Sequence, residues 1–219
     1  MSPQEMLSWV RGTGLQLSVA VFVLGMSYRM LHLAMLGRKK NLAAPRGSEW
    51  GPGLRTIWRR SFFLPQLTAR GKFTVVAGYA FHLGFFITLL FLSQHIALFR
   101  SLFGFGWPAL PRGVIDFTAI IGIAGLIALL VHRMIDPVKR LLTTLQDYLA
   151  WLLSFLPLLT GFMLLRGIGG DYTHLMALHL LSVELLLVIA PFTKLAHMLS
   201  TFSARWYNGA VAGYKGMQA

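Results

Sequence analysis

Four histidines lie inside long apolar stretches of the chain, where ionisable side chains are rare. His82 and His95 fall in one stretch, and His179 and His197 fall in another. A neutral imidazole can bind a metal ion or pass a proton, and an ionisable residue within hydrocarbon usually marks a functional site. The alternative for each histidine is a hydrogen bond to a carbonyl of a neighbouring helix. Two stretches with two histidines each favour a shared chemical role.

The spacing of the histidines predicts how they are arranged in depth. On one continuous helix, His179 and His197 are about five turns apart, so they share a face and lie about 27 Å apart along the axis. His82 and His95 differ by about 220° around a helix, which is a poorer fit. If the two helices are antiparallel, His82 pairs with His197 toward the inside and His95 with His179 toward the outside.

The composition predicts an integral membrane protein. Of the 219 residues, 56% are hydrophobic and only 12% are charged, which is far from the balance of a soluble domain. A helix of about 20 apolar residues crosses a bilayer. Five stretches qualify, approximately Gly14–Leu36, Phe73–Phe99, Val114–Ile135, Tyr148–Leu165 and His174–Leu199. We therefore expect an all-α protein with five transmembrane helices.

Charge placement predicts the orientation. Lysine and arginine number 20 against 7 aspartate and glutamate residues, and most lie between the apolar runs, which indicates topology and lipid headgroups and not nucleic acid. Their concentration in residues 37–72 predicts a cytoplasmic loop there, an outside amino terminus and a cytoplasmic carboxyl terminus. We expect one transmembrane domain over residues 1–203 and a cytoplasmic tail over 204–219. The aromatic and basic segment Trp50–Phe63 is either interfacial or a docking surface for a cytoplasmic partner.

The absence of cysteine restricts the redox chemistry. It excludes disulfides, c-type haem attachment and an iron–sulfur cluster bound by this chain's own thiolates. Noncovalent haem and a bound quinone remain. Two imidazoles fill both axial positions of a haem iron, which favours electron transfer. We therefore expect two b haems, one on His82 and His197 and one on His95 and His179, with a single haem as the alternative.

Other polar residues in the spans are candidates for contacts with haem propionates or with a quinone, namely Arg29, Arg112, Asp116 and Lys194. Arg29 either pairs with a propionate or extends to the lipid headgroups. Asp116, with Arg112 and His95, either lines an outer pocket that accepts protons from a quinol or forms an ordinary ion pair with Arg112.

The roles of two further residues, Glu184 and His174, are left open by the sequence. Glu184 lies deep in the fifth apolar stretch, where it is either protonated and hydrogen-bonded or part of a proton path. His174, near the outer end of the same stretch, is a reserve ligand that could replace His95 or His179 in the outer pair.

Three local motifs resemble one protein family. The second stretch contains Phe81-His82-Leu83-Gly84. The approach to the fourth contains Arg133, Pro137, Lys139-Arg140, Thr143-Thr144 and Asp147. The fifth contains His179 and then Pro191-Phe192-Thr193-Lys194-Leu195-Ala196-His197. Over about Gly71 to Ser200, the chain resembles the gamma (cytochrome b) subunit of respiratory nitrate reductase and related membrane subunits of heterodisulfide-reductase-like complexes.

The resemblance implies five spans, an outside amino terminus, two bis-histidine b haems and a quinol site beside the outer haem. It carries over His82, His179 and His197 as ligands. It does not carry over His95, because the family's other ligand in the second span falls at Leu92 of this chain.

We therefore expect a haem b subunit of a prokaryotic inner membrane. It would pass electrons between a quinol/quinone pool and an iron–sulfur protein on the cytoplasmic side. Such a subunit is not catalytically complete alone, and dimerisation of the complex stays open. The alternatives are a haem-free quinone-binding anchor and a proton-conducting transporter. A transporter would normally have broken or repeated helices, and the sequence predicts neither.

Overall fold

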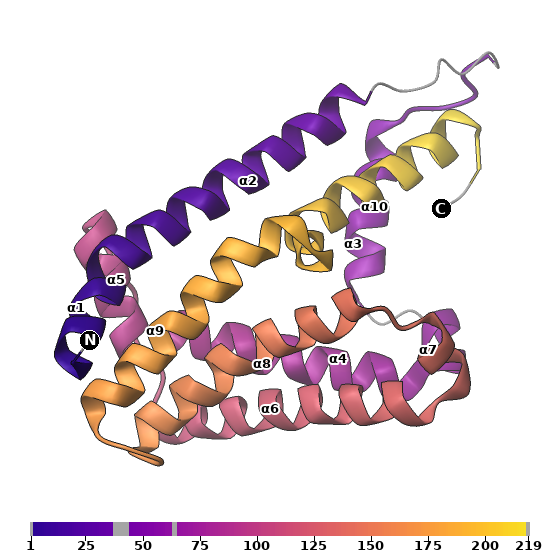
Figure 1. Ribbon diagram of the computed structural model, residues 1–219. Helices are drawn as coiled ribbons and strands as arrows, with labels where there is room; N and C mark the ends of the chain where they lie inside the picture. Colours follow the sequence, from indigo (N-terminus) through magenta and orange to yellow (C-terminus); the bar gives the residue numbers. More distant parts are fainter. Residues whose placement is uncertain (1, 37–43, 63–64, 218–219) are drawn as a thin grey trace. The chain divides into compact units, whose positions relative to one another are not determined.

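The computed structural model describes residues 2–36, 44–62 and 65–217, and within these ranges every regular element is a helix (Figure 1). The elements are α1 (Pro3–Trp9), the π-helical turn η1 (Val10–Gly14), α2 (Leu15–Met35), α3 (Trp50–Ser61), α4 (Pro65–Phe91), α5 (Ser93–Phe103), α6 (Arg112–Ile135), α7 (Pro137–Leu142), α8 (Leu145–Arg166), α9 (Tyr172–Ile189), the short 3₁₀ turns η2 (Ala190–Phe192) and η3 (Lys194–Ala196), and α10 (His197–Tyr214).

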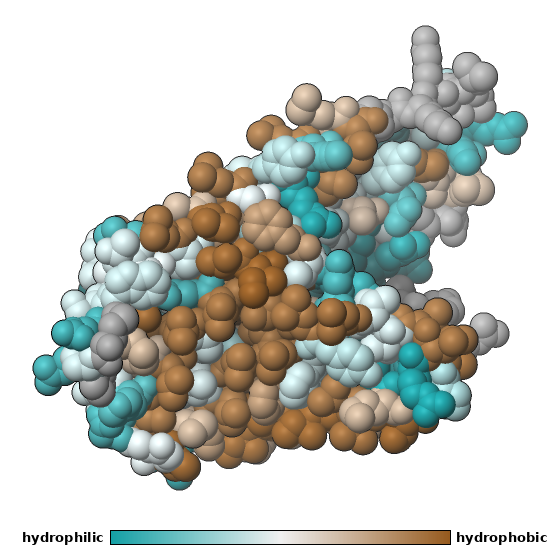
Figure 2. Space-filling view, viewed as in Figure 1, coloured by the Kyte–Doolittle hydropathy of each residue, from teal (hydrophilic) through white to brown (hydrophobic). Residues whose placement is uncertain are grey.

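Five helices of the described part are long and apolar enough to cross a membrane, which confirms the predicted all-α, multi-pass class. They are Gln4–Met35, Gly71–Phe91, Arg112–Ile135, Leu145–Arg166 and Tyr172–Phe192. Large apolar side chains on these helices are exposed, among them Leu83, Phe117 and Ile120. Figure 2 shows the hydrophobic surface that such residues produce over α6, α8 and α9. Exposed apolar surface on a spanning helix is what lipid contact requires.

The chain forms two compact units. The first comprises Met1–Val19 and Phe73–Val188, and the second comprises Ala20–Lys72 and Ile189–Ala219. The predicted boundary between residues 203 and 204 falls inside α10, which runs without interruption from His197 to Tyr214.

Glycines set the spacing of the helices in the first unit. A Cβ at Gly84 of α4 would overlap the carbonyl oxygen of Thr118 and would lie 2.8 Å from the backbone of Gly122, both in α6. The two backbones can approach this closely only because both glycines lack side chains. The core beside this contact consists of Ala119, Leu126 and Leu158, surrounded by Phe81, Ile123, Trp151, Phe155 and Phe162.

The predicted second span is not one helix, and the prediction of a continuous Phe73–Phe99 helix is wrong. Leu92 has extended backbone angles (φ −72°, ψ 130°), which end α4 and start α5 as a separate helix. The calculated 220° offset between His82 and His95 therefore does not apply. No glycine or proline stands at the break, so the local sequence does not predict it.

The predicted fifth span is also broken, so the face shared by His179 and His197 on one helix was a wrong inference. α9 ends at Ile189, two 3₁₀ turns follow, and Thr193 between them is extended (φ −124°, ψ −177°). Pro191 has no N–H to continue the helical hydrogen-bond pattern, which explains the interruption. His197 is the first residue of α10.

In the second unit, α3 and α10 pack against each other through small residues. A Cβ at Gly209 would overlap Thr56, and a Cβ at Gly53 would lie 2.7 Å from the ring of Trp206. Thr56 is buried and donates a hydrogen bond to the carbonyl of Pro52 at 2.8 Å. The predicted loop over residues 37–72 therefore contains a helix, α3, that packs against α10. Its basic residues Arg38, Lys39 and Lys40 lie outside the described residues.

Candidate functional site

His95 and His179 lie side by side in the first unit. Their ring centroids are 6.3 Å apart, and the ring planes are within 16° of parallel. His95 comes from α5 and His179 from α9, so two separate helices supply the pair. Both side chains are half-buried. This is the pairing predicted for the outer site.

His95 is held by the break that ends α4. Its Nδ1 donates to the carbonyl of Leu89 at 3.0 Å and approaches that of Thr88 at 3.3 Å. Carbonyls in the last turn of a helix lack intrahelical partners and need other donors. Because a carbonyl oxygen only accepts, the Nδ1 of His95 carries the hydrogen and Nε2 carries the lone pair.

The next carbonyls of α4 are satisfied from the segment that follows α5. The indole Nε1 of Trp107 donates to the carbonyl of Leu90 at 2.7 Å, and the N–H of Leu110 donates to that of Phe91 at 3.1 Å. The break at Leu92 is thus stabilised by residues distant from it in the sequence. It turns α5 so that His95 lies beside His179.

His179 is held by α8. Thr160 donates to the carbonyl of Leu156 at 2.7 Å, and Ser182 donates to the carbonyl of His179 at 2.7 Å. Each hydroxyl has one hydrogen, so the 3.2 Å contact between Thr160 Oγ1 and His179 Nδ1 is completed by a hydrogen on Nδ1. Nε2 of His179 again carries the lone pair.

Gly161 makes room for this ring. A Cβ there would lie 2.9 Å from Cε1 of His179 and 3.3 Å from its Nδ1. The absence of a side chain at residue 161 therefore lets the imidazole lie directly on the α8 backbone.

By residue type, proximity and tautomer, His95 and His179 could together hold a metal such as a haem iron. Ligating histidines usually donate their other ring N–H to an oxygen, as both rings do here. No group of three or more His, Asp or Glu side chains arranged to hold a metal ion is found in residues 2–36, 44–62 and 65–217.

The other predicted ligands, His82 and His197, belong to different units. Nδ1 of His82 donates to the carbonyl of Gly78 at 2.7 Å, and Nδ1 of His197 donates to that of Lys194 at 2.8 Å. Both are exposed, and both have the tautomer with the lone pair on Nε2. Their pairing stays a prediction.

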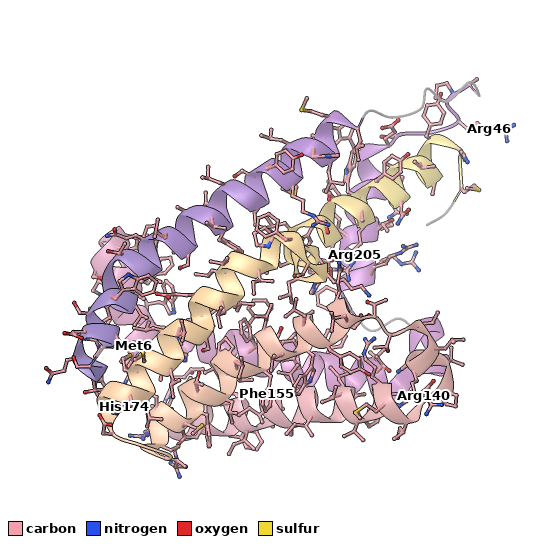
Figure 3. The ribbon with its side chains drawn as sticks, in the orientation of Figure 1. Met6, Arg46, Arg140, Phe155, His174 and Arg205 are labelled. Carbon is pink, nitrogen blue, oxygen red and sulfur yellow. The ribbon has the colours of Figure 1, made fainter. Side chains whose placement is uncertain are left out.

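His174, the reserve ligand, has a different environment. Figure 3 shows it at the beginning of α9, beside the turn from α8. Its Nδ1 contacts the carboxylate of Asp171, and both side chains are more than half exposed. This hydrogen bond holds the pKa of Asp171 below its usual value. His95, and not His174, is the histidine placed against the ring of His179.

Asp116 pairs with a different arginine from the one predicted. Its Oδ2 accepts from Arg166 at 3.0 Å, whereas Arg112 donates to the carbonyl of Leu165. α6 and α8 are antiparallel neighbours, so the end of α8 carries Arg166 to the start of α6. The expected Asp116–Arg112 ion pair is therefore wrong. Oδ1 of Asp116 is buried and has no hydrogen-bond partner among the described residues.

Arg29 has a structural contact in the second unit. It donates to the carbonyl of Pro191 at 2.8 Å, at the break that follows α9. A Cβ at Gly25 would lie 2.7 Å from Pro191, so α2 packs closely on this break. Neither the predicted propionate contact nor extension to headgroups is needed to explain Arg29. Lys194 is exposed, and its carbonyl accepts from His197.

Glu184 is buried, with 5% of its surface exposed, and its Oε1 has no hydrogen-bond partner among the described residues. A Cβ at Gly14 would lie 2.7 Å from Oε1, so the carboxyl group faces the π-helical turn η1. The hydrogen-bonded alternative for Glu184 therefore has no support at Oε1.

Sequence reasoning missed Thr160, Gly161 and Trp107. A hydroxyl next to a glycine on the apolar stretch before His179 is a weak signal, because threonine often bonds to its own helix. The indole of Trp107 could not be assigned to Leu90 without the path of the chain after α5.

The comparisons with known proteins leave the family open. No protein-family profile and no solved structure matches the chain. A protein of Nitratidesulfovibrio vulgaris (strain Hildenborough), named only "Protein", is 39% identical over 133 residues. The match covers 61% of this chain and 58% of the relative, so the chain spans little more than half of the relative's length.

Proposed function

We propose that this chain is a haem b electron-transfer subunit of a membrane oxidoreductase complex, with His95 and His179 as the axial ligands of the outer haem. The observation that carries the proposal is their pairing at 6.3 Å, with each Nδ1 hydrogen directed at an oxygen. A haem bound there would supply one-electron redox chemistry.

The surrounding residues orient the two imidazoles. The carbonyl of Leu89 and the hydroxyl of Thr160 keep the hydrogens on Nδ1, which makes Nε2 the ligating nitrogen in both rings. A hydrogen bond donated by Nδ1 also makes Nε2 more basic. The oxygen that accepts this bond would therefore strengthen the bond between Nε2 and a metal. The backbone at Gly161 supports the ring of His179.

We also propose, from the sequence resemblance, that His82 and His197 are ligands of an inner haem. The support is their tautomers, which match those of the outer pair, and the resemblance of the sequence around both residues to the nitrate reductase gamma subunit. Electrons would then pass between a quinol/quinone pool on the outer side and an iron–sulfur protein on the cytoplasmic side of a prokaryotic inner membrane.

Asp116 is the candidate proton acceptor of the quinol site. Its Oδ2 is held by Arg166, and its buried Oδ1 has no partner among the described residues. Quinol oxidation releases protons, so a carboxylate near the outer end of the bundle suits that step.

The test is the haem content of purified protein in lipid nanodiscs. We expect a b-type spectrum on reduction and two haems per chain, and His95→Ala and His179→Ala should each lose about half of the haem because one axial ligand is removed. His174→Ala is the matched control and should retain both. Protein without any haem would overturn the proposal, whereas loss in His174→Ala alone would overturn the choice of His95.

A proton-conducting transporter is the second candidate, and two observations favour it. Helix breaks near membrane spans are common in transporters, and the structure has breaks where two candidate spans end, at Leu92 and at Pro191–Thr193. Glu184 is also buried with an unpaired oxygen. Proton flux into vesicles by haem-free protein, abolished in Glu184→Gln, would favour this function. A haem-free anchor would show quinone binding, no haem and no flux.

A further inference from the structure

The helix α3 has one face that packs inside the second unit and another that is exposed. Gly53 and Thr56 face α10, where Thr56 is 1% exposed. Trp50 also touches α10, with its ring edge-on and 5.5 Å from that of Trp206, but it stays 70% exposed, so much of the remaining α3 surface is open to contacts outside this unit.

Large apolar side chains follow one line along the exposed face. Trp50, Leu54 and Trp58 are 70%, 59% and 69% exposed, and Phe62, just past the helix, is 54% exposed. Residues four apart lie on the same side of a helix, so these side chains form a continuous stripe. We call these four residues the α3 stripe. Exposure of so many aromatic rings in one line indicates a contact surface.

Arginines flank the α3 stripe. At about 100° per residue, Arg55 and Arg59 lie next to the α3 stripe, with Arg59 between the stripe and Thr56. Both are exposed, and α3 contains no aspartate or glutamate. An apolar line bordered by arginine is the pattern of a helix that lies in a membrane interface.

The chain keeps α3 close to the bilayer. Only residues 62–64 separate α3 from α4, whose membrane span begins at Gly71. The other end of α3 connects to α2, a second membrane helix that ends at Met35. A helix tethered at both ends to spans lies within reach of the lipid headgroups.

We propose that α3 lies in the interface of an anionic bilayer, with the α3 stripe in contact with the upper acyl chains and with Arg55 and Arg59 on lipid phosphates. Tryptophan prefers this depth because its ring is apolar and its N–H is polar. Arginine suits phosphate because its guanidinium donates two parallel hydrogen bonds. This surface is independent of the haem proposal.

Spin labelling tests the depth of α3 in the full-length protein. The chain has no native cysteine, so Leu54→Cys, Trp58→Cys and Arg60→Cys each give one labelled site. In nanodiscs of mixed phosphatidylethanolamine and phosphatidylglycerol, labels at 54 and 58 should be more accessible to oxygen than to a water-soluble nickel complex. The label at 60 replaces an exposed side chain about 120° away from Leu54, at the end of α3, and should show the reverse. Equal exposure of all three labels to the nickel complex would overturn the proposal.

A second measurement tests the charge. Replacing Arg55 and Arg59 by glutamine in the Leu54→Cys protein should raise nickel accessibility at position 54 several-fold in anionic nanodiscs. Moving the Leu54→Cys protein that keeps both arginines into neutral phosphatidylcholine nanodiscs should have the same effect. No difference between anionic and neutral lipid would overturn the assignment of anionic headgroups. Labels that become protected only when a cytoplasmic protein is added would instead identify a protein-docking surface. An unchanged haem spectrum in these variants separates this result from the proposed function.

Discussion

The two breaks in the membrane helices differ in what causes them. At Pro191 the missing N–H removes one helical hydrogen bond, and the chain continues as 3₁₀ turns. At Leu92 no residue forbids a helix, and the break is held by one nearby donor, His95 of α5, and by two donors from beyond α5, Trp107 and Leu110. A histidine follows each break and donates from Nδ1 to a carbonyl in or before it, Leu89 for His95 and Lys194 for His197.

A candidate ligand and an irregular backbone can therefore support each other. The break leaves a carbonyl without its helical partner, and that carbonyl sets which nitrogen of the histidine carries the hydrogen. At Leu92 the support runs in both directions, so removing the donors should remove the break. At Pro191, removing the donors should leave the break in place.

The largest expected effect comes from removing two donors at Leu92. In His95→Ala/Trp107→Phe, the carbonyls of Leu89 and Leu90 lose their partners, and joining α4 and α5 into one helix would satisfy them. Spin labels at Val76→Cys and Leu98→Cys, both on exposed side chains, measure this change. We expect the separation of the two backbone sites to lengthen toward about 33 Å, the value for a straight helix. A distance unchanged from that of the labelled parent would show that the break needs neither donor.

Gly161→Ala should have the next largest effect, because the new Cβ would lie 2.9 Å from the ring of His179. Overpacking of this kind costs about 1–3 kcal/mol. We expect loss of about half of the haem in the spectrum of the reduced protein, as for His179→Ala. Gly113→Ala is the matched control, since nothing lies within 4 Å of a Cβ at that glycine. Equal haem content in both variants would argue against Gly161 as a support for His179.

Arg29→Gln tests the second break. The guanidinium donates to the carbonyl of Pro191 at 2.8 Å, and hydrogen bonds to charged groups contribute about 1.5–3 kcal/mol. Thermal unfolding in detergent should show lower stability by about that amount, with the haem spectrum retained. Arg29→Lys should recover part of the loss. Complete loss of one haem in Arg29→Gln would instead support a propionate contact.

The smallest expected effect is that of Trp107→Phe alone. The ring is kept and one neutral hydrogen bond to Leu90 is lost, which costs about 1 kcal/mol. Tyr28→Phe, on an exposed residue, serves as the control in the same unfolding experiment. If both variants unfold alike, the Trp107 hydrogen bond contributes little to the break.

The sequence predicted the positions of the apolar spans better than the points at which their helices break. The predicted Val114–Ile135 and Tyr148–Leu165 correspond to α6 and α8 within a few residues, because the length of an apolar run is a local property. The break at Leu92 could not be predicted, because its donors follow the helix and come near it only after the chain has turned back. The partner of Asp116 was missed for the same reason, since helix packing and not spacing brings Arg166 to it.

What the sequence alone determined is the class of the protein: apolar runs long enough to span a bilayer, basic residues between them, and histidines within the apolar runs. These follow from residue type and local spacing. The tertiary structure decided which histidine meets His179, because His95 reaches it only from a helix redirected at Leu92. Such a redirection depends on hydrogen bonds between segments far apart in the chain, and helical periodicity along one segment carries no information about them.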